Sequence, residues 1–181
     1  IPVPVSQGIA DDLKIKVLNI WKQLTIPYLI TDNEHFRRIL SAITDSMDVS
    51  ASLKQKHIQP QVVQAADLEI PSDISNTDPE DIAFIQFSSG STSAPKGVTL
   101  THRNLVYNVA DIARRSRISS KDISLSWMPL HHDMGMICFH LTSLFCDIDQ
   151  VLLQTDVCIR RPLLWLECIT KSRASLIYSP N

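Results

Sequence analysis

Two short apolar runs enclose a polar loop in the stretch IAFIQFSSGSTSAPKGVTL, residues 82–100. The loop, Ser88–Gly97, holds five hydroxyl side chains, two of the chain's four glycines and one lysine. Gly90 allows backbone N–H groups to approach an anion, the hydroxyl groups donate hydrogen bonds, and Lys96 supplies a compact positive charge. This composition is typical of a phosphate-binding loop. A flexible serine-rich hairpin has the same composition, and on composition alone it is the more common structure.

The order of the loop residues separates these alternatives. A P-loop requires glycine, four residues and then Gly-Lys-Ser or Gly-Lys-Thr. Here six residues separate Gly90 from Gly97, and the lysine precedes the second glycine, so the P-loop motif is absent. The order resembles instead the Ser/Thr-Ser-Gly-Ser/Thr-Thr-Gly-x-Pro-Lys-Gly signature of the adenylate-forming superfamily. That superfamily includes acyl-CoA synthetases, luciferases and the adenylation domains of nonribosomal peptide synthetases.

The resemblance covers nine of the ten loop positions and continues through Thr101-His-Arg-Asn-Leu105. It departs at Ser93, where the family usually has glycine, and fatty acyl-AMP ligases tolerate this substitution more often than their relatives. The resemblance implies ATP with Mg²⁺ as the cofactor. It also implies that the ATP phosphates are bound by Ser88, Ser89, Gly90, Ser91, Thr92, Ser93, Lys96 and Gly97.

A second stretch, SWMPLHHDMGM at residues 126–136, resembles a run found in fatty acyl-AMP ligases and in the loading domains of polyketide and peptide synthases. A strand that ends at Pro129 delivers the following residues to the carboxyl edge of a sheet, where ligands bind in doubly wound folds. A histidine here is more often a structural residue, but the resemblance assigns His132 to the acyl and α-phosphate site as a catalytic candidate. Asp133 either caps the next helix or orients the site. The implied substrate pocket comprises His132, Asp133, Met134 and Gly135.

Hydrophobic periodicity predicts strands that alternate with helices. Strands are expected at residues 27–31, 61–65, 82–87, 98–100, 123–128, 150–154 and 174–178. Helices are expected at residues 11–24, 36–47, 134–145 and 162–170, with a further helix capped by Thr101. This alternation predicts an α/β fold with a mainly parallel, doubly wound sheet and helices on both faces. On the resemblance, residues 1–181 are a fragment of one AMP-binding (adenylation) domain, part of the N-terminal domain of an adenylate-forming enzyme, with an acidic connector at residues 66–81.

Composition excludes several other classes of protein. The 17 Lys and Arg residues against 19 Asp and Glu give a net charge of −2, which provides no basic face for nucleic acid or a membrane surface. The cysteines and histidines lack zinc-ligand spacing, so no protein-bound metal is expected. No apolar run approaches the roughly 20 residues of a membrane span, and no signal peptide is recognisable. We therefore expect a cytoplasmic protein.

The resemblance implies an acid ligase that converts a fatty acid and ATP into fatty acyl-adenylate and pyrophosphate. The acyl group would then pass to the phosphopantetheine thiol of an acyl carrier protein, in polyketide or nonribosomal peptide synthesis, or to coenzyme A. An apolar run, Met134–Phe139, favours a hydrocarbon substrate over an amino acid, whose buried ammonium group needs a carboxylate. An acyl-CoA synthetase, an amino-acid adenylation domain and a non-catalytic nucleotide-binding module remain alternatives.

The family's adenine- and ribose-binding motifs and its adenylation lysine have no counterpart in the 181 residues. We therefore expect this chain to be a fragment of a larger polypeptide, and to be inactive by itself.

Overall fold

The computed structural model describes residues 2–4, 17, 19–20, 23–24, 76–88 and 96–179. The chain divides into two compact units. One unit comprises Ile1–Pro4, Thr77–Phe87 and Gly97–Asn181 and holds most of the described residues; the other comprises Val5–Asn76 and Ser88–Lys96. The predicted elements at 27–31, 36–47 and 61–65 lie outside the described residues, as does most of the connector at 66–81.

Part of the first predicted helix, at residues 11–24, is described. Val17, Asn19, Ile20 and Gln23 are helical, and Val17 and Ile20 are buried. The two buried side chains are three positions apart, which is the spacing of one helix face. The structure thus agrees with the predicted helix at these positions, whereas Leu24, the last predicted residue, is not helical.

β3 (Ile123–Ser126) is the central strand of a three-stranded sheet, between β4 (Asp149–Leu152) and β5 (Leu176–Ile177). Both neighbours run parallel to β3, and Leu125 pairs with Val151 on one side and Ile177 on the other. Leu125 is fully buried, and the serines on either side of it are 1% exposed. Burial of successive residues is typical of a parallel strand covered on both faces. The predicted parallel α/β sheet is confirmed for these strands.

The sequence predicted β3 to extend to residue 128, but the strand ends at Ser126. The Ser126 hydroxyl accepts a hydrogen bond from the Met128 N–H at 3.1 Å. A serine side chain that bonds the backbone two residues later forms a turn and competes with strand geometry. The chain therefore leaves the sheet before Pro129 and turns directly into the next helix.

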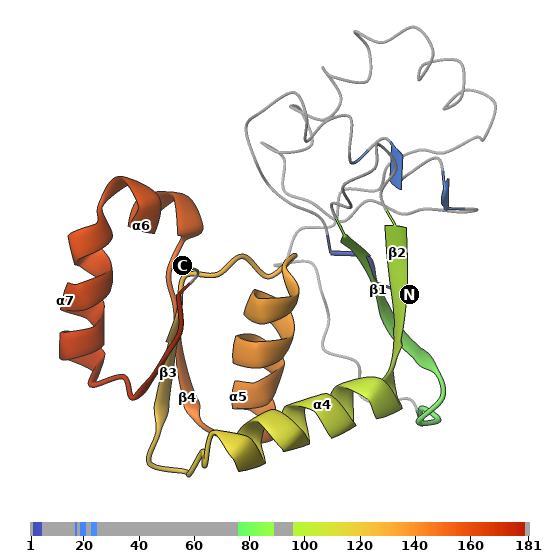
Figure 1. The fold of residues 1–181 in the computed structure, drawn as a ribbon, viewed down its shortest axis with the longest axis horizontal. Helices are drawn as coiled ribbons and strands as arrows, with labels where there is room; N and C mark the ends of the chain where they lie inside the picture. Colours follow the sequence, from blue (N-terminus) through green and yellow to red (C-terminus); the bar gives the residue numbers. More distant parts are fainter. Residues whose placement is uncertain are drawn as a thin grey trace, which may run out of the picture. The chain divides into compact units, whose positions relative to one another are not determined.

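Helices lie on both sides of this sheet (Figure 1). α6 (Thr155–Arg160) and α7 (Pro162–Ser172) lie on one side, and α5 (Thr142–Phe145) lies on the other. α7 was predicted, and it begins at Pro162, which suits a first helical position because proline has no N–H to satisfy. α6 was not predicted. No helix in the described part of the chain is long and apolar enough to cross a membrane.

The helix predicted at residues 134–145 has two parts. Met134–Leu141 is a π-helix, η2, and α5 follows it. At its end, the Thr142 N–H and the Thr142 hydroxyl both donate to the carbonyl of Ile137, five residues earlier, and the hydroxyl distance is 2.8 Å. A five-residue spacing is that of a π-turn, and such turns are rare and frequently found at functional sites. The predicted helix is therefore present, with π-helical geometry over its first eight residues.

β1 (Ile82–Ser88) and β2 (Lys96–Thr101) are hydrogen-bonded neighbours, and α4 (His102–Arg115) begins directly after β2. A capping box fixes this junction: the Thr101 hydroxyl accepts the Asn104 N–H at 3.2 Å, and the Asn104 carbonyl oxygen accepts the Thr101 N–H at 3.1 Å. The prediction that Thr101 caps a helix is confirmed. The strand and the helix are thereby joined without a flexible linker.

Asp122 connects the turn before β3 to the residue before β5. Its carboxylate accepts hydrogen bonds from the Ser175 hydroxyl at 2.7 Å, and from the N–H and hydroxyl of Ser119 at 2.7 and 2.9 Å. The Ser175 bond, followed by the two from Ser119, holds the pKa of Asp122 below its ordinary value. These bonds fix the entry of both strands into the sheet.

We expect Asp122→Asn to lower the thermal unfolding midpoint at neutral pH, because an amide has one acceptor oxygen and cannot accept hydrogen bonds from both Ser119 and the Ser175 hydroxyl. The folded-state pKa lies below the unfolded value of about 3.9. The ionised Asp122 carboxylate therefore stabilises the fold above about pH 4, and this stabilisation is lost as the pH falls through the folded-state pKa. Melting curves from neutral to acidic pH should converge for the two proteins. A difference in unfolding midpoint that stayed constant from neutral to acidic pH would contradict this role of the Asp122 carboxylate. Asp149→Asn, at an exposed site on β4, is the matched control.

Candidate functional site

The site begins at the carboxyl end of β3, where a tight turn leads into η2. Within it, the His132 N–H donates to the Pro129 carbonyl at 3.0 Å, and the Met136 N–H donates to the His132 carbonyl at 2.9 Å. The buried Gln86 side chain of β1 donates to the His131 carbonyl at 3.2 Å, which ties β1 to this turn. The sequence analysis did not identify Gln86. The one amide within an otherwise apolar strand was the signal that could have indicated it.

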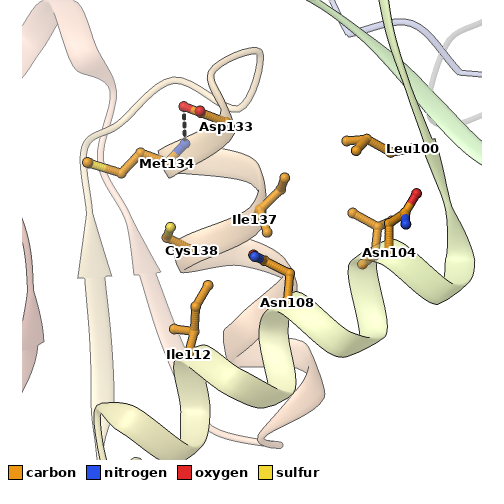
Figure 2. A pocket seen from close by; sticks show the side chains of 9 residues that line it. Leu100, Asn104, Asn108, Ile112, Asp133, Met134, Ile137 and Cys138 are labelled. Carbon is orange, nitrogen blue, oxygen red and sulfur yellow. Dashed lines mark hydrogen bonds between the residues drawn. The ribbon is translucent and has the colours of Figure 1, made fainter.

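His132 and Asp133 are exposed neighbours at the start of η2. The Asp133 carboxylate accepts the Met134 N–H at 2.7 Å, and it lies 2.7 Å from His132 Nδ1 (Figure 2 shows the first of these bonds). The predicted capping role of Asp133 is therefore present in the structure. When His132 Nδ1 carries the proton, it donates to Asp133 and leaves Nε2 as an acceptor. A catalytic role for His132 stays a prediction.

Gly135 is buried because the first turn of η2 lies against the preceding backbone. A Cβ atom at this position would lie 2.3 Å from the Pro129 carbonyl oxygen and 2.9 Å from that of Met128. Real Cβ contacts are never this short, so the sequence needs glycine here for close approach. The structure thus gives Gly135 a packing role, and a substrate-contacting role for it stays untested.

An open cleft of about 460 Å³ lies between α4 and η2 (Figure 2). Two residues of the predicted substrate pocket, Asp133 and Met134, line this cleft, whereas His132 and Gly135 do not. It is lined by Leu100, Asn104, Leu105, Asn108, Ile112, Asp133, Met134, Ile137 and Cys138. The α4 wall was not predicted, because its two asparagines have the character of a solvent-exposed helix face.

The predicted apolar run Met134–Phe139 is divided between two environments. Met134, Ile137 and Cys138 line the cleft, whereas Phe139 is 1% exposed and packs edge-to-face on Tyr178 with ring centroids 5.3 Å apart. Burial, and to a smaller extent the Asp133 carboxylate, raises the pKa of the Cys138 thiol. The thiol therefore stays neutral at physiological pH and adds to an uncharged wall.

The predicted phosphate loop lies mostly outside the described residues. Ser89, Gly90, Ser91, Thr92 and Ser93 are among the positions not described, while Ser88 ends β1 and Lys96 begins β2. The loop thus starts and ends on neighbouring strands. A Cβ at Gly97 would lie 3.0 Å from Ile85 Cγ2 and 3.1 Å from Phe87 Cζ, which shows that β1 and β2 pack closely here. Binding of ATP phosphates by this set stays a prediction.

Comparison with known proteins identifies the family. The profile of the family described as "AMP-binding enzyme" matches residues 9–181. The chain belongs to the AMP-binding enzymes. Its fold is accordingly the α/β fold of adenylation domains, of which it covers the N-terminal part. The described residues contain no group of three or more His, Cys, Asp or Glu side chains that could hold a metal ion.

Two curated relatives illustrate the range of the family. The chain is 44% identical over 104 residues to a "Putative acyl-CoA synthetase" of Caulobacter vibrioides, a match that covers 57% of this chain and 18% of that protein. It is 30% identical over 149 residues to "Medium-chain-fatty-acid--[acyl-carrier-protein] ligase JamA" of Moorena producens, covering 82% and 22% respectively. The chain spans about a fifth of the length of these relatives.

Two solved AMP-binding structures resemble the whole chain. McyG A-PCP, complexed with phenylalanyl-adenylate, is 31% identical with a TM-score of 0.79, and the match covers 99% of this chain and 28% of that one. A fatty acyl-adenylate ligase from L. pneumophila, in complex with acyl adenylate and pyrophosphate, is 27% identical with a TM-score of 0.74 and coverage of 96% and 29%. These two structures thus hold different adenylates.

Proposed function

We propose that this chain is part of an ATP-dependent enzyme, here called the complete enzyme, that activates a fatty acid as its acyl-adenylate. The acyl group then passes to the phosphopantetheine thiol of an acyl carrier protein, with coenzyme A as the alternative acceptor. The observation that carries the proposal is the cleft between α4 and η2, whose η2 wall is apolar apart from Asp133 at the start of that helix. The similarity to a carrier-protein ligase and to a fatty acyl-adenylate ligase supports it.

The chemistry of the cleft favours a fatty acid over an amino acid. A bound amino acid needs a carboxylate for its α-ammonium group, because an unpaired buried charge is costly. Asp133 is the one carboxylate among the lining residues, and it is already engaged by the Met134 N–H and by His132. A hydrocarbon chain, in contrast, needs only apolar surface such as Met134 and Ile137 provide.

The reaction brings a carboxylate to a polyphosphate, so catalysis depends on neutralising negative charge. In this proposal the Ser88–Gly97 loop binds the phosphates of ATP, and His132 lies beside the reacting carboxylate. Mg²⁺ is the expected counter-ion of ATP, since it is generally held through substrate phosphates rather than by a protein cage. Binding of the β- and γ-phosphates by this loop would leave the α-phosphorus open to in-line attack. We propose a cytoplasmic location for this enzyme.

The test is pyrophosphate exchange by the complete enzyme with saturated fatty acids of four to sixteen carbons. Each CH₂ group that enters an apolar site contributes about 0.8 kcal/mol, or roughly fourfold in kcat/KM. We expect kcat/KM to rise over several carbons and then level off as the chain outgrows the cleft. Amino acids are expected to be poor substrates. Activation of an amino acid without activation of octanoate or dodecanoate would overturn the fatty-acid assignment, while leaving adenylate formation intact.

A further inference from the structure

Gln86 is a buried amide in β1, where residues 82–87 are otherwise apolar. It is 9% exposed, the same fraction as its neighbour Phe87. Burial of an amide is unfavourable unless its hydrogen-bonding groups find partners. A methionine or a leucine would fill this position without that cost. Packing of β1 alone therefore does not explain why the position holds an amide.

The hydrogen bond of Gln86 joins two segments that are far apart in the sequence. Its Nε2 atom donates to the carbonyl of His131, 45 positions along the chain, at 3.2 Å. Both residues belong to the same compact unit. β1 continues along the chain into the predicted phosphate loop, whereas His131 lies in the turn that carries His132 and Asp133. The bond thus sets the spacing between the end of β1 and this turn.

The carbonyl that accepts this bond belongs to the peptide group between His131 and His132. The N–H of the same peptide group donates to the Pro129 carbonyl at 3.0 Å. Both polar ends of one peptide group are therefore hydrogen-bonded, one to a side chain of β1 and the other within the turn. The His132 side chain is 55% exposed, so backbone geometry more than packing determines where its ring begins. The orientation of this peptide group thus directs His132.

On this basis we propose that Gln86 is a positioning residue for adenylate formation. It holds the peptide group between His131 and His132 against β1, so that the His132 ring meets the reacting carboxylate, and it touches no reacting atom itself. The proposal rests on the proposed function, in which His132 lies beside that carboxylate, and deepens it by naming the residue that directs His132.

The experiment is Gln86→Met in the complete enzyme, measured by pyrophosphate exchange with ATP and dodecanoic acid. Methionine is close in size to glutamine and cannot donate to the His131 carbonyl. We expect kcat to fall about tenfold, because fewer bound substrates reach the reactive geometry. The KM values for ATP and dodecanoic acid should stay unchanged, because His132 acts in the transition state and not in substrate binding.

Gln150→Met is the matched control, since it makes the same substitution at another hydrogen-bonded amide. The Gln150 side chain, in β4, bonds His140 Nδ1 at 2.8 Å, and neither residue lines the cleft. This variant should keep the wild-type kcat.

A double-mutant cycle tests whether Gln86 acts through His132. Addition of Gln86→Met to His132→Ala should not lower kcat further, because the ring that Gln86 directs is already absent. A residue that only supported the fold would lower kcat by the same factor in both backgrounds. Equal factors in the two backgrounds, or a wild-type kcat in Gln86→Met, would overturn the proposal. A wild-type kcat in His132→Ala would overturn it together with the role proposed for His132.

A second variant provides the answer if Gln86→Met does not fold. Gln86→Glu keeps the shape of the side chain, but its carboxyl group donates to the His131 carbonyl only when it is protonated. Its kcat relative to the wild type should therefore be higher at about pH 6 than at about pH 8. A relative kcat that was low and identical at both pH values would contradict a donor role for Gln86.

Failure of the proposed function would look different from failure of this proposal. Exchange with an amino acid and with no fatty acid would overturn the fatty-acid assignment, and it would be seen in the wild-type enzyme. The comparison of Gln86→Met with the wild type would then be made with that amino acid, and the same tenfold loss in kcat would be expected.

Discussion

Lys96→Ala is expected to slow adenylate formation by the complete enzyme by about 10²–10³-fold, the typical effect of removing one preorganised donor to developing charge. Lys96 begins β2, so a hydrogen-bonded strand positions its backbone while its exposed side chain remains available to an anion. The loss should appear mainly in kcat for pyrophosphate exchange, because the charge on the phosphates increases in the transition state.

Two further variants serve as comparisons: one keeps the positive charge at position 96, and the other removes a lysine elsewhere. Lys96→Arg should recover only part of the rate, since a planar guanidinium does not replace a compact ammonium group in a tight loop. Lys121→Ala, at an exposed lysine in the turn before β3, should leave the rate unchanged. If Lys96→Ala turned over at the wild-type rate, Ser88–Gly97 would be a polar hairpin without a catalytic function.

Gly135→Ala is expected to have the largest effect on stability. The added Cβ would lie 2.3 Å from a backbone oxygen, and backbone cannot move aside as a flexible side chain can. Either η2 or the turn at Pro129 must shift, at a cost of about 3 kcal/mol in the free energy of unfolding. The midpoint of urea unfolding measures this cost. The shift should also reduce activity, since the turn carries His132 and Asp133.

Gly97→Ala is the matched control for this prediction. Its Cβ would meet side-chain atoms of Ile85 and Phe87 at 3.0–3.2 Å, and small movements of these side chains relieve such contacts. The loss of stability should therefore be near 1 kcal/mol, the lower end of the usual range for overpacking. Equal losses for the two alanine variants would show that the backbone around Pro129 is free to adjust.

The elements that could be predicted from sequence are those with a local physical signal. Thr101 precedes an apolar helical stripe and has an amide three residues later, and the capping box that this pattern favours is present. The run at β3 was recognised because its apolar residues lie between turn formers. Its end was misplaced, because the turn depends on a hydrogen bond from the Met128 N–H to the Ser126 side chain, which hydrophobic periodicity does not report.

The features that could not be predicted depend on the helix type or on the neighbouring element. Residues 134–141 are apolar except for His140, so no hydrophobic periodicity distinguished a π-helix from an α-helix. Asn104 and Asn108 have the sequence character of solvated residues and are exposed, and only the position of α4 beside η2 makes them part of the cleft lining. The phosphate-loop prediction rests on residue order, and the geometry of most of that loop lies outside the described residues.

The order of strands in the sheet determines when this part of the protein can fold during synthesis. β3 pairs with β4 and also with β5, and the second pairing joins Ser124 to Leu176. As the chain leaves the ribosome, one edge of β3 stays unpaired until residues 176–177 have emerged. An unpaired strand edge is a template for association with other chains. A pause in translation between α6 and β5 would prolong this exposure, whereas rapid synthesis of α7 would shorten it.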